Sequence, residues 1–179
     1  MKNTEGKFKL KQVEVRLKLV KRRPLYANKE IVSPGDAVAV MADAMAEFDR
    51  EHLCVVNLDV AGHPLNFSVV SIGDVKNSLV SMQSLYKSSI LSNASRILAL
   101  HNHPSGSIAP TKLDVEVTKR MIEAGKIMNI PLVDHIIVGA YTGDYYSFLS
   151  NQPELFQESS ENKRICAEGE KQGNQLMQK

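Results

Sequence analysis

The chain has 179 residues, of which 43% are hydrophobic and 23% charged, and its formal net charge is +2. This length and composition predict one globular domain that needs no metal ion or disulfide merely to fold. No apolar run approaches the roughly 18 residues that span a membrane, and residues 1–7 lack the apolar stretch of a signal peptide, so we expect a cytoplasmic protein. Neither Cys54 nor Cys166 belongs to a Cys-x-x-Cys pair, which excludes a four-cysteine zinc site.

The first region, residues 1–32, is marked by alternation and positive charge. Apolar residues alternate with polar ones over 8–19, which predicts either a strand pair or one strand with a bulge. Eight Lys or Arg and only one acid, Glu14, lie between Lys7 and Arg23. Lysines on the solvated face of an edge strand explain this charge, because they block pairing with other sheets. A surface for nucleic acid or an acidic partner is the alternative explanation.

The second region, 33–150, contains most of the predicted helices and strands. A helix begins after Ser33, a typical N-cap residue that is followed by Pro34 in the first helical position. Apolar residues then recur at helical spacing, and we expect this stripe to pack in the core: Val38, Met41, Met45 and Phe48. The segments 51–59 and 65–72 resemble strands, and the turn residues between them predict a hairpin.

The remaining elements complete a mixed pattern of helices and strands. A helix is predicted over 79–92, with an apolar face of Leu79, Met82, Leu85, Tyr86, Ile90 and Leu91. A third helix is predicted over 112–128, and strands are predicted over 96–100, 131–139 and 145–149. Together they predict a mixed α/β (α+β) fold, in which a curved mixed sheet of about six strands has helices on both sides. The third region, 151–179, is polar, and we expect it to be disordered or loosely helical.

The candidate site begins where the strand over 96–100 runs into His101 and His103. These two side chains point to the same face, because side chains alternate along a strand. They can share one metal ion if a third ligand joins them and one position stays open for water. Asp114 supplies that ligand if the ten-residue loop before it, which contains Pro and Gly, folds back over the histidines. Two nitrogens and one oxygen suit zinc.

The same aspartate also has a structural explanation. Thr111 and Asp114 have the spacing of a capping box, in which a threonine begins a helix and an acid three residues later completes the cap. A capping role and metal ligation are compatible for a residue at the start of a helix. The pair of histidines favours the metal site over capping alone.

These residues resemble a known family. The sequence Leu-Ala-Leu-His-Asn-His-Pro-Ser-Gly over 98–106, followed by Thr-x-x-Asp over 111–114, resembles the JAB/JAMM metalloprotease signature of His-x-His and Ser-x-x-Asp. It looks most like the RadC branch, in which His-Asn-His-Pro-Ser-Gly is typical. The similarity extends to 134–139 and 51–59, and covers roughly 33–150. The resemblance implies a JAB (MPN) metalloprotease domain that binds zinc and cleaves a peptide or isopeptide bond.

The resemblance also implies roles for two further residues. Glu51 occupies the place of the family's general base at the start of a strand, whereas the competing Glu47 falls within a predicted helix. Thr111 replaces the family's serine, whose hydroxyl is thought to stabilise the oxyanion. The hydroxyl is kept and a methyl group is added, so the alternatives for Thr111 are to act on the oxyanion, to act weakly or only to cap the helix. Longer RadC proteins carry a helix-hairpin-helix region for which residues 1–30 offer no counterpart, which weakens an inference of DNA binding.

Other metal-dependent enzymes fit the sequence poorly. The HNH nucleases are named for residues spread over a fold and not for a contiguous tripeptide. A zinc nucleobase deaminase needs His-x-Glu and a later Pro-Cys-x-x-Cys, and a thermolysin-type protease needs His-Glu-x-x-His. None of these motifs occurs. The remaining alternative is a DNA-repair-associated module of RadC type that binds DNA or a protein and has a structural or vestigial metal site.

The expected partners follow from these two interpretations. The enzyme requires a peptide or protein substrate, and the basic first region is the candidate for binding nucleic acid. Within the strand over 131–139, His135 is predicted to be a buried, hydrogen-bonded histidine, with the alternative of a partner to a metal ligand. Asn102 lies between the two histidines and should point to the opposite face, which predicts a structural role.

Overall fold

The structure is a computed structural model that describes residues 30–46, 48–72, 80–139 and 142–157. The elements are, in chain order, α1 (Pro34–Ala46), β1 (His52–Leu58), β2 (Pro64–Ile72), α2 (Met82–Leu91), β3 (Arg96–His103), α3 (Lys112–Met128), β4 (Leu132–Gly139), β5 (Tyr145–Ser147), α4 (Phe148–Asn151) and a 3-10 turn, Pro153–Leu155. The predicted mixed α+β class is confirmed. The predicted strand within 8–19 lies outside the described residues.

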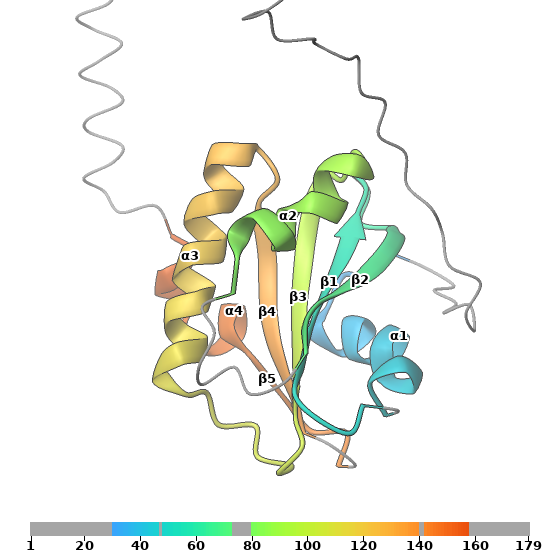
Figure 1. Cartoon of the computed structure of the whole chain (residues 1–179), viewed down its shortest axis with the longest axis vertical. Helices are drawn as coiled ribbons and strands as arrows, with labels where there is room; N and C mark the ends of the chain where they lie inside the picture. Colours follow the sequence, from blue (N-terminus) through green and yellow to red (C-terminus); the bar gives the residue numbers. More distant parts are fainter. Residues whose placement is uncertain (1–29, 47, 73–79, 140–141, 158–179) are drawn as a thin grey trace, which may run out of the picture.

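The five described strands form one open sheet in the order β2-β1-β3-β4-β5 (Figure 1). The pairs β1–β2, β1–β3 and β4–β5 are antiparallel, and the first of these is the predicted hairpin. Only β3 and β4 are parallel, and α3 is the crossover between them. The end of β3 and the beginning of α3 therefore lie at the same edge of the sheet.

Helices cover both faces of the sheet (Figure 1). On one face, Met41 and Met45 of α1 pack against apolar residues of the three central strands, among them Cys54, Val56, Leu100 and Ile136. On the other face, α2 and α3 pack against alternate residues of the same strands: Leu53, Val55, Ile97, Ala99 and Leu132. Because Ile97 and Ala99 face α3, the same alternation directs His101 and His103 towards that helix.

The boundaries of α1 and α3 follow their caps. Asp36 N–H donates to Ser33 Oγ at 3.2 Å, and Ser33 N–H donates back to Asp36 Oδ2 at 3.0 Å. The predicted helix over 112–128 is confirmed as α3, which is capped by Asn129 in the left-handed conformation. Local hydrogen bonds of short polar side chains determine both helix starts, which is why the sequence predicts them well.

Two elements differ from their predictions. Ile90 of α2 is 49% exposed, because the buried face of this helix is formed by Leu85, Tyr86 and the small Ser89. The last strand ends at Ser147 and not at residue 149. The buried Asp134 carboxylate accepts hydrogen bonds from Ser147 Oγ at 2.6 Å and from Leu149 N–H at 2.9 Å, and these bonds turn the chain into α4.

The end of the described chain packs against the core. Leu155 and Phe156 pack against the core on the α2 and α3 side, and residues 158–179 lie outside the described part.

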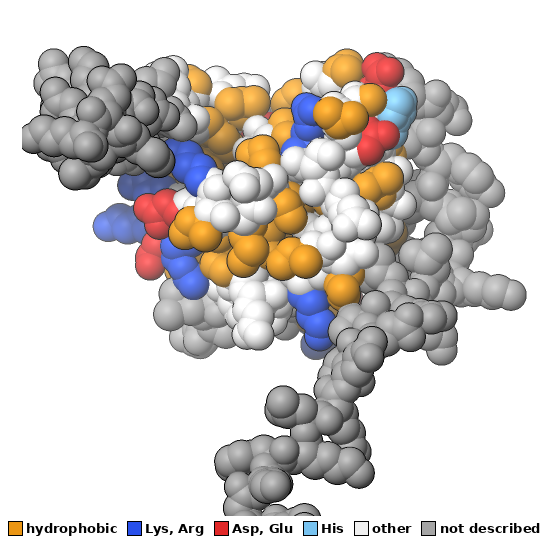
Figure 2. Space-filling view, turned by 90° about the horizontal axis from the view of Figure 1, so that it is seen from above, with side chains coloured by type: hydrophobic (Ala, Val, Ile, Leu, Met, Phe, Trp, Pro, Cys, Tyr) orange, Lys and Arg blue, Asp and Glu red, His pale blue; other side chains and the backbone are white. Residues whose placement is uncertain are grey.

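Figure 2 looks onto the upper end of Figure 1, where Lys and Arg side chains lie in separate groups among apolar and uncharged ones. Of the helices in the described ranges, none has both the length and the apolar character to cross a membrane.

Candidate metal centre

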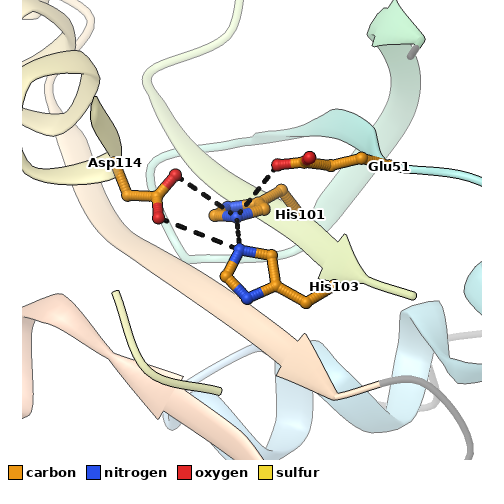
Figure 3. Close-up of side chains that lie close together, drawn as sticks. All are labelled: Glu51, His101, His103 and Asp114. Atoms are coloured by element: carbon orange, nitrogen blue, oxygen red, sulfur yellow. Dashed lines mark hydrogen bonds and ion pairs between the residues drawn. The ribbon is translucent and has the colours of Figure 1, made fainter. Parts of the chain in front are cut away.

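Four predicted site residues meet at the end of β3 (Figure 3). His101 and His103 come from β3, Asp114 from the first turn of α3, and Glu51 from the residue before β1. Each offers a ligand atom, and these four atoms all lie within 4.8 Å of one another. The side chains of His101 and Asp114 are 3% and 5% exposed, and that of Glu51 is 20% exposed. The cluster is therefore largely buried and open on the side of Glu51.

The loop after His103 folds back as the sequence suggested. Gly106 N–H donates to the His103 carbonyl at 3.0 Å, and Gly106 has a φ of +79°, which only glycine adopts readily. The loop then passes close to β4, where a Cβ on Gly139 would lie 2.8 Å from the Gly106 carbonyl oxygen. Two glycines thus allow the close approach that returns the chain to the histidines at the start of α3.

Thr111 and Asp114 form the predicted capping box, and Asp114 faces the histidines at the same time. The Thr111 hydroxyl and N–H each donate to Asp114 Oδ2 at 2.7 Å, and Asp114 N–H donates to Thr111 Oγ1 at 3.2 Å. Asp114 Oδ1 lies 3.5 Å from His101 Nε2, and Oδ2 lies 3.8 Å from His103 Nε2. The cap therefore fixes the carboxylate in the orientation that a ligand needs.

The distances within the cluster suit a tetrahedral ion. The two Nε2 atoms of His101 and His103 are 2.8 Å apart, and Glu51 Oε1 lies 3.7 Å from His101 Nε2. Zinc bonds of about 2.0–2.1 Å in a tetrahedron place neighbouring donor atoms about 3.4 Å apart. Four of the separations in the cluster, from 2.8 to 3.8 Å, lie on both sides of this value, and all four ligand atoms lie within 4.8 Å of one another. The cluster therefore has the size of a site for one metal ion.

The protonation of His103 follows from its second ring nitrogen. Nδ1 lies 2.7 Å from the carbonyl oxygen of Ser107, which can only accept a hydrogen bond. Nδ1 must therefore carry the proton. In the neutral ring, Nε2 is then left with a lone pair, and this atom is the one that faces His101 and Asp114.

A longer chain of hydrogen bonds determines the tautomer of His101. The Thr118 hydroxyl donates to the Asp114 carbonyl at 2.6 Å, so Thr118 Oγ1 must accept from His135 Nδ1 at 2.7 Å. His135 Nε2 is then the acceptor for His101 Nδ1–H at 2.9 Å. The Nε2 atom of His101 is consequently left with a lone pair directed into the cluster.

Burial keeps the rings of His101 and His135 neutral. Desolvation is the main cause that lowers the pKa of His101 to about 4; the Asp114 carboxylate opposes the shift and the His103 ring adds to it. Desolvation likewise lowers the pKa of His135 well below its usual value. When both histidine rings of the cluster are neutral, two imidazole lone pairs and two carboxylates converge, and the Nδ1–H groups point outward. Such a set of acceptors attracts a cation.

His135 is buried and hydrogen-bonded, as predicted, but its partner is the candidate ligand His101. Sequence reasoning missed Thr118 altogether. Its position four residues after Asp114, on the same face of α3, was a usable signal.

Glu47, the competing base, lies outside the described residues. Cys54 faces the α1 side, and burial raises its pKa to about 12, so this thiol is no ligand for the cluster.

The hydrogen-bond chain predicts the effect of a remote substitution. Thr118→Val keeps the side-chain shape but leaves His135 Nδ1–H without its acceptor, and the His101 ring loses its orientation. We expect the affinity of the cluster for a metal ion, measured with zinc, to fall by about 10- to 100-fold. Competition with a chromophoric chelator measures this change. Ser89→Ala, which removes a buried hydroxyl without a hydrogen-bond partner in the described structure, is the control. Equal zinc affinity of Thr118→Val and the wild type would contradict the role.

The cluster opens onto a hollow between the sheet and α3. Its lining combines the polar groups of the cluster with the apolar side chains of Leu53, Val80 and Val117. The polar atoms therefore lie against an apolar wall, where electrostatic interactions are stronger than in open water.

The basic segment between residues 7 and 23, the candidate for binding nucleic acid, lies outside the described residues.

Comparison with known proteins identifies relatives. The family model described as RadC-like JAB domain matches residues 31–154. A UPF0758 protein of Caldanaerobacter subterraneus subsp. tengcongensis is 38% identical over 127 residues, which are 68% of this chain and 54% of the relative. For a UPF0758 protein of Syntrophomonas wolfei subsp. wolfei the identity is 41% over 113 residues, covering 61% and 48%. For one of Methanosarcina acetivorans it is 34% over 137 residues, covering 75% and 60%.

The chain spans about half the length of these curated relatives, so the comparisons concern the domain and not a whole protein. Within that domain the family model covers well over half of the chain, including every described strand and the four clustered side chains. The resemblance inferred from the His-Asn-His-Pro-Ser-Gly segment is thereby confirmed. The chain belongs to the RadC-like JAB domain family.

Proposed function

We propose that this chain is a zinc-dependent hydrolase that cleaves a peptide or isopeptide bond. The observation that carries the proposal is the convergence of two imidazole lone pairs and the Asp114 carboxylate at one point, with Glu51 beside them. Two nitrogens and one carboxylate oxygen with an open fourth position are typical of catalytic zinc sites. Membership of a JAB domain family supports hydrolysis as the reaction class.

The side chains divide into ligands and a base. His101, His103 and Asp114 would hold the ion through Nε2, Nε2 and a carboxylate oxygen. A zinc ion bound there lowers the pKa of a coordinated water towards about 7 and polarises a carbonyl oxygen. The Glu51 carboxylate is less buried than the ligands and lies on the open side of the cluster. Glu51 then accepts the proton of the attacking water and delivers it to the leaving amine.

Thr111 has a positioning role in this scheme. Its single hydroxyl proton is donated to Asp114 Oδ2, so the hydroxyl orients a ligand. The predicted hydrogen bond to an oxyanion requires the hydroxyl to rotate away from Asp114, and this role stays a prediction. The choice of a peptide or isopeptide bond is inferred from the resemblance to the JAB/JAMM metalloproteases. The chain spans about half the length of its relatives, so the substrate of the whole protein is part of the proposal.

Removal and restoration of the metal test the proposed function. The purified chain, stripped with a chelator, is incubated with a mixed peptide library and with a lysine-linked isopeptide, before and after one equivalent of zinc. We expect cleavage only after zinc is restored, with new termini visible by mass spectrometry. Zinc binding without cleavage of any probe would contradict the enzyme.

A binding module is the alternative that such a result would favour. Its supporting feature is the basic segment between residues 7 and 23. Binding of duplex DNA that weakens steeply with salt, in the absence of peptide cleavage, would identify it. On the face seen in Figure 2, the Lys and Arg side chains of the described residues lie in separate groups.

A further inference from the structure

The residue between the two histidines contacts the chain on both sides of Glu51. Asn102 Oδ1 accepts a hydrogen bond from His52 N–H at 2.8 Å, and Asn102 Nδ2 donates to the Arg50 carbonyl at 2.9 Å. Both hydrogen bonds join side chain to backbone across about 50 positions of sequence. The amide of Asn102 therefore bridges the two peptide groups that flank the Glu51 side chain.

These contacts begin where the backbone ladder stops. The pairing of β1 with β3 ends at Leu53 and His101, although the register would next place His52 opposite Asn102. Beyond that point β3 continues to pair with β4, whereas the asparagine side chain takes the place of direct pairing to β1. A side-chain amide holds two backbones further apart than a direct hydrogen bond does. The start of β1 is thus joined to β3 through the Asn102 side chain, by hydrogen bonds on both sides of Glu51.

The surroundings fix this arrangement. Asn102 is 2% exposed, and its amide places an acceptor against an N–H and a donor against a carbonyl, so only one orientation satisfies both ends. The same Arg50 carbonyl lies 2.9 Å from His52 Nδ1, and the His52 ring stacks on Phe48 at 3.9 Å between centroids. Burial makes the loss of the hydrogen bond to His52 N–H costly, because its donor and acceptor are shielded from water.

We propose that Asn102 is a positioning residue that holds Glu51 beside the metal cluster. Alternation along β3 directs His101 and His103 to one face and Asn102 to the other, so three consecutive residues serve the same site from both faces of the strand. The structural part of this proposal rests on the described contacts alone. Its consequence for catalysis rests on the proposed function.

Two variants of Asn102 separate its hydrogen bonds. Asn102→Ala removes both, whereas Asn102→Asp keeps the acceptor for His52 N–H and loses the donor to the Arg50 carbonyl. Asn57→Ala is the matched control, because Asn57 is a fully buried asparagine of β1 that bonds Asn66 and not the cluster. The first measurement is amide hydrogen exchange of the full-length, metal-free chain. We expect the His52 amide to exchange about tenfold faster or more in Asn102→Ala, and to stay protected in Asn102→Asp.

The second measurement uses cobalt(II) as a spectroscopic probe of the loaded chain. We expect Asn102→Ala to bind one cobalt ion per chain, since the ligands are unchanged. The pH at which the cobalt absorption changes should shift in the same direction as in Glu51→Gln, and stay at the wild-type value in Asn57→Ala. A merely structural asparagine would not shift it.

The outcomes distinguish this inference from the proposed function. A protected His52 amide in Asn102→Ala, or a cobalt titration identical to that of the wild type, would overturn the positioning role. An equal shift in Asn57→Ala would also overturn it, because general loosening would then explain the effect. If the wild-type chain binds neither zinc nor cobalt, the proposed function fails, and the exchange measurement alone decides whether Asn102 holds the segment around Glu51.

Discussion

Glu51→Gln is expected to abolish hydrolysis while the chain still binds one zinc ion. Glutamine has the shape of glutamate but cannot accept the proton of the attacking water. Glu51 Oε1 lies 3.7 Å from His101 Nε2 on the open side of the cluster, whereas the three proposed ligands are other side chains of the cluster. Loss of a general base costs about 10²- to 10⁴-fold in rate. The rate of cleavage and the zinc content by mass spectrometry should therefore respond differently to this substitution.

The control for this experiment is Glu123→Gln, which makes the same change of charge at an exposed position of α3. It should cleave at the wild-type rate. A Glu51→Gln protein that lacks zinc would show that Glu51 is a ligand and not the base. Unchanged cleavage by zinc-loaded Glu51→Gln would assign the base to another residue.

The second large effect is expected for His103→Ala, which should lose the metal. The substitution removes one of the three proposed protein ligands, together with the Nδ1 hydrogen bond to Ser107 that orients the ring. Structural zinc sites with four ligands bind with about 10–16 kcal/mol, or roughly 3 kcal/mol per ligand, so affinity should fall by about 10²-fold or more. The chain should stay folded, because His103 lies at the end of β3, outside both apolar clusters.

Zinc content after purification and dialysis measures this loss, and far-ultraviolet circular dichroism checks the fold. His63→Ala is the matched control: its side chain is 50% exposed and hydrogen-bonds Asp59 in the turn between β1 and β2. We expect one zinc per chain in the control and in the wild type. Full zinc content in His103→Ala would remove this histidine from the ligand set.

Local sequence patterns predict part of the candidate site. Alternation in β3 places His101 and His103 on one face, and the capping box at Thr111 determines where α3 begins. Both are short-range effects of backbone geometry and of polar side chains that bond neighbouring peptide groups. The resemblance to a known family then directed attention to Glu51, which no local pattern would have distinguished from an ordinary exposed acid.

The contacts around these residues escaped prediction because they join distant parts of the chain. His101 meets His135 across 34 positions, and Asn102 meets His52 across 50. Such contacts depend on which strands become neighbours and in which register, and that choice is made by the packing of the whole core.

By itself, then, the sequence determined the starts of α1 and α3, the hairpin, the strand that carries the histidines and the identities of the two histidines and the aspartate. The tertiary structure decided which nitrogen of each histidine faces the cluster. That choice depends on the Ser107 carbonyl and on the path from His101 through His135 and Thr118 to Asp114. It also decided that Asn102 holds the segment around Glu51. Hydrogen bonds act over about 3 Å, so only the folded chain brings these partners within reach.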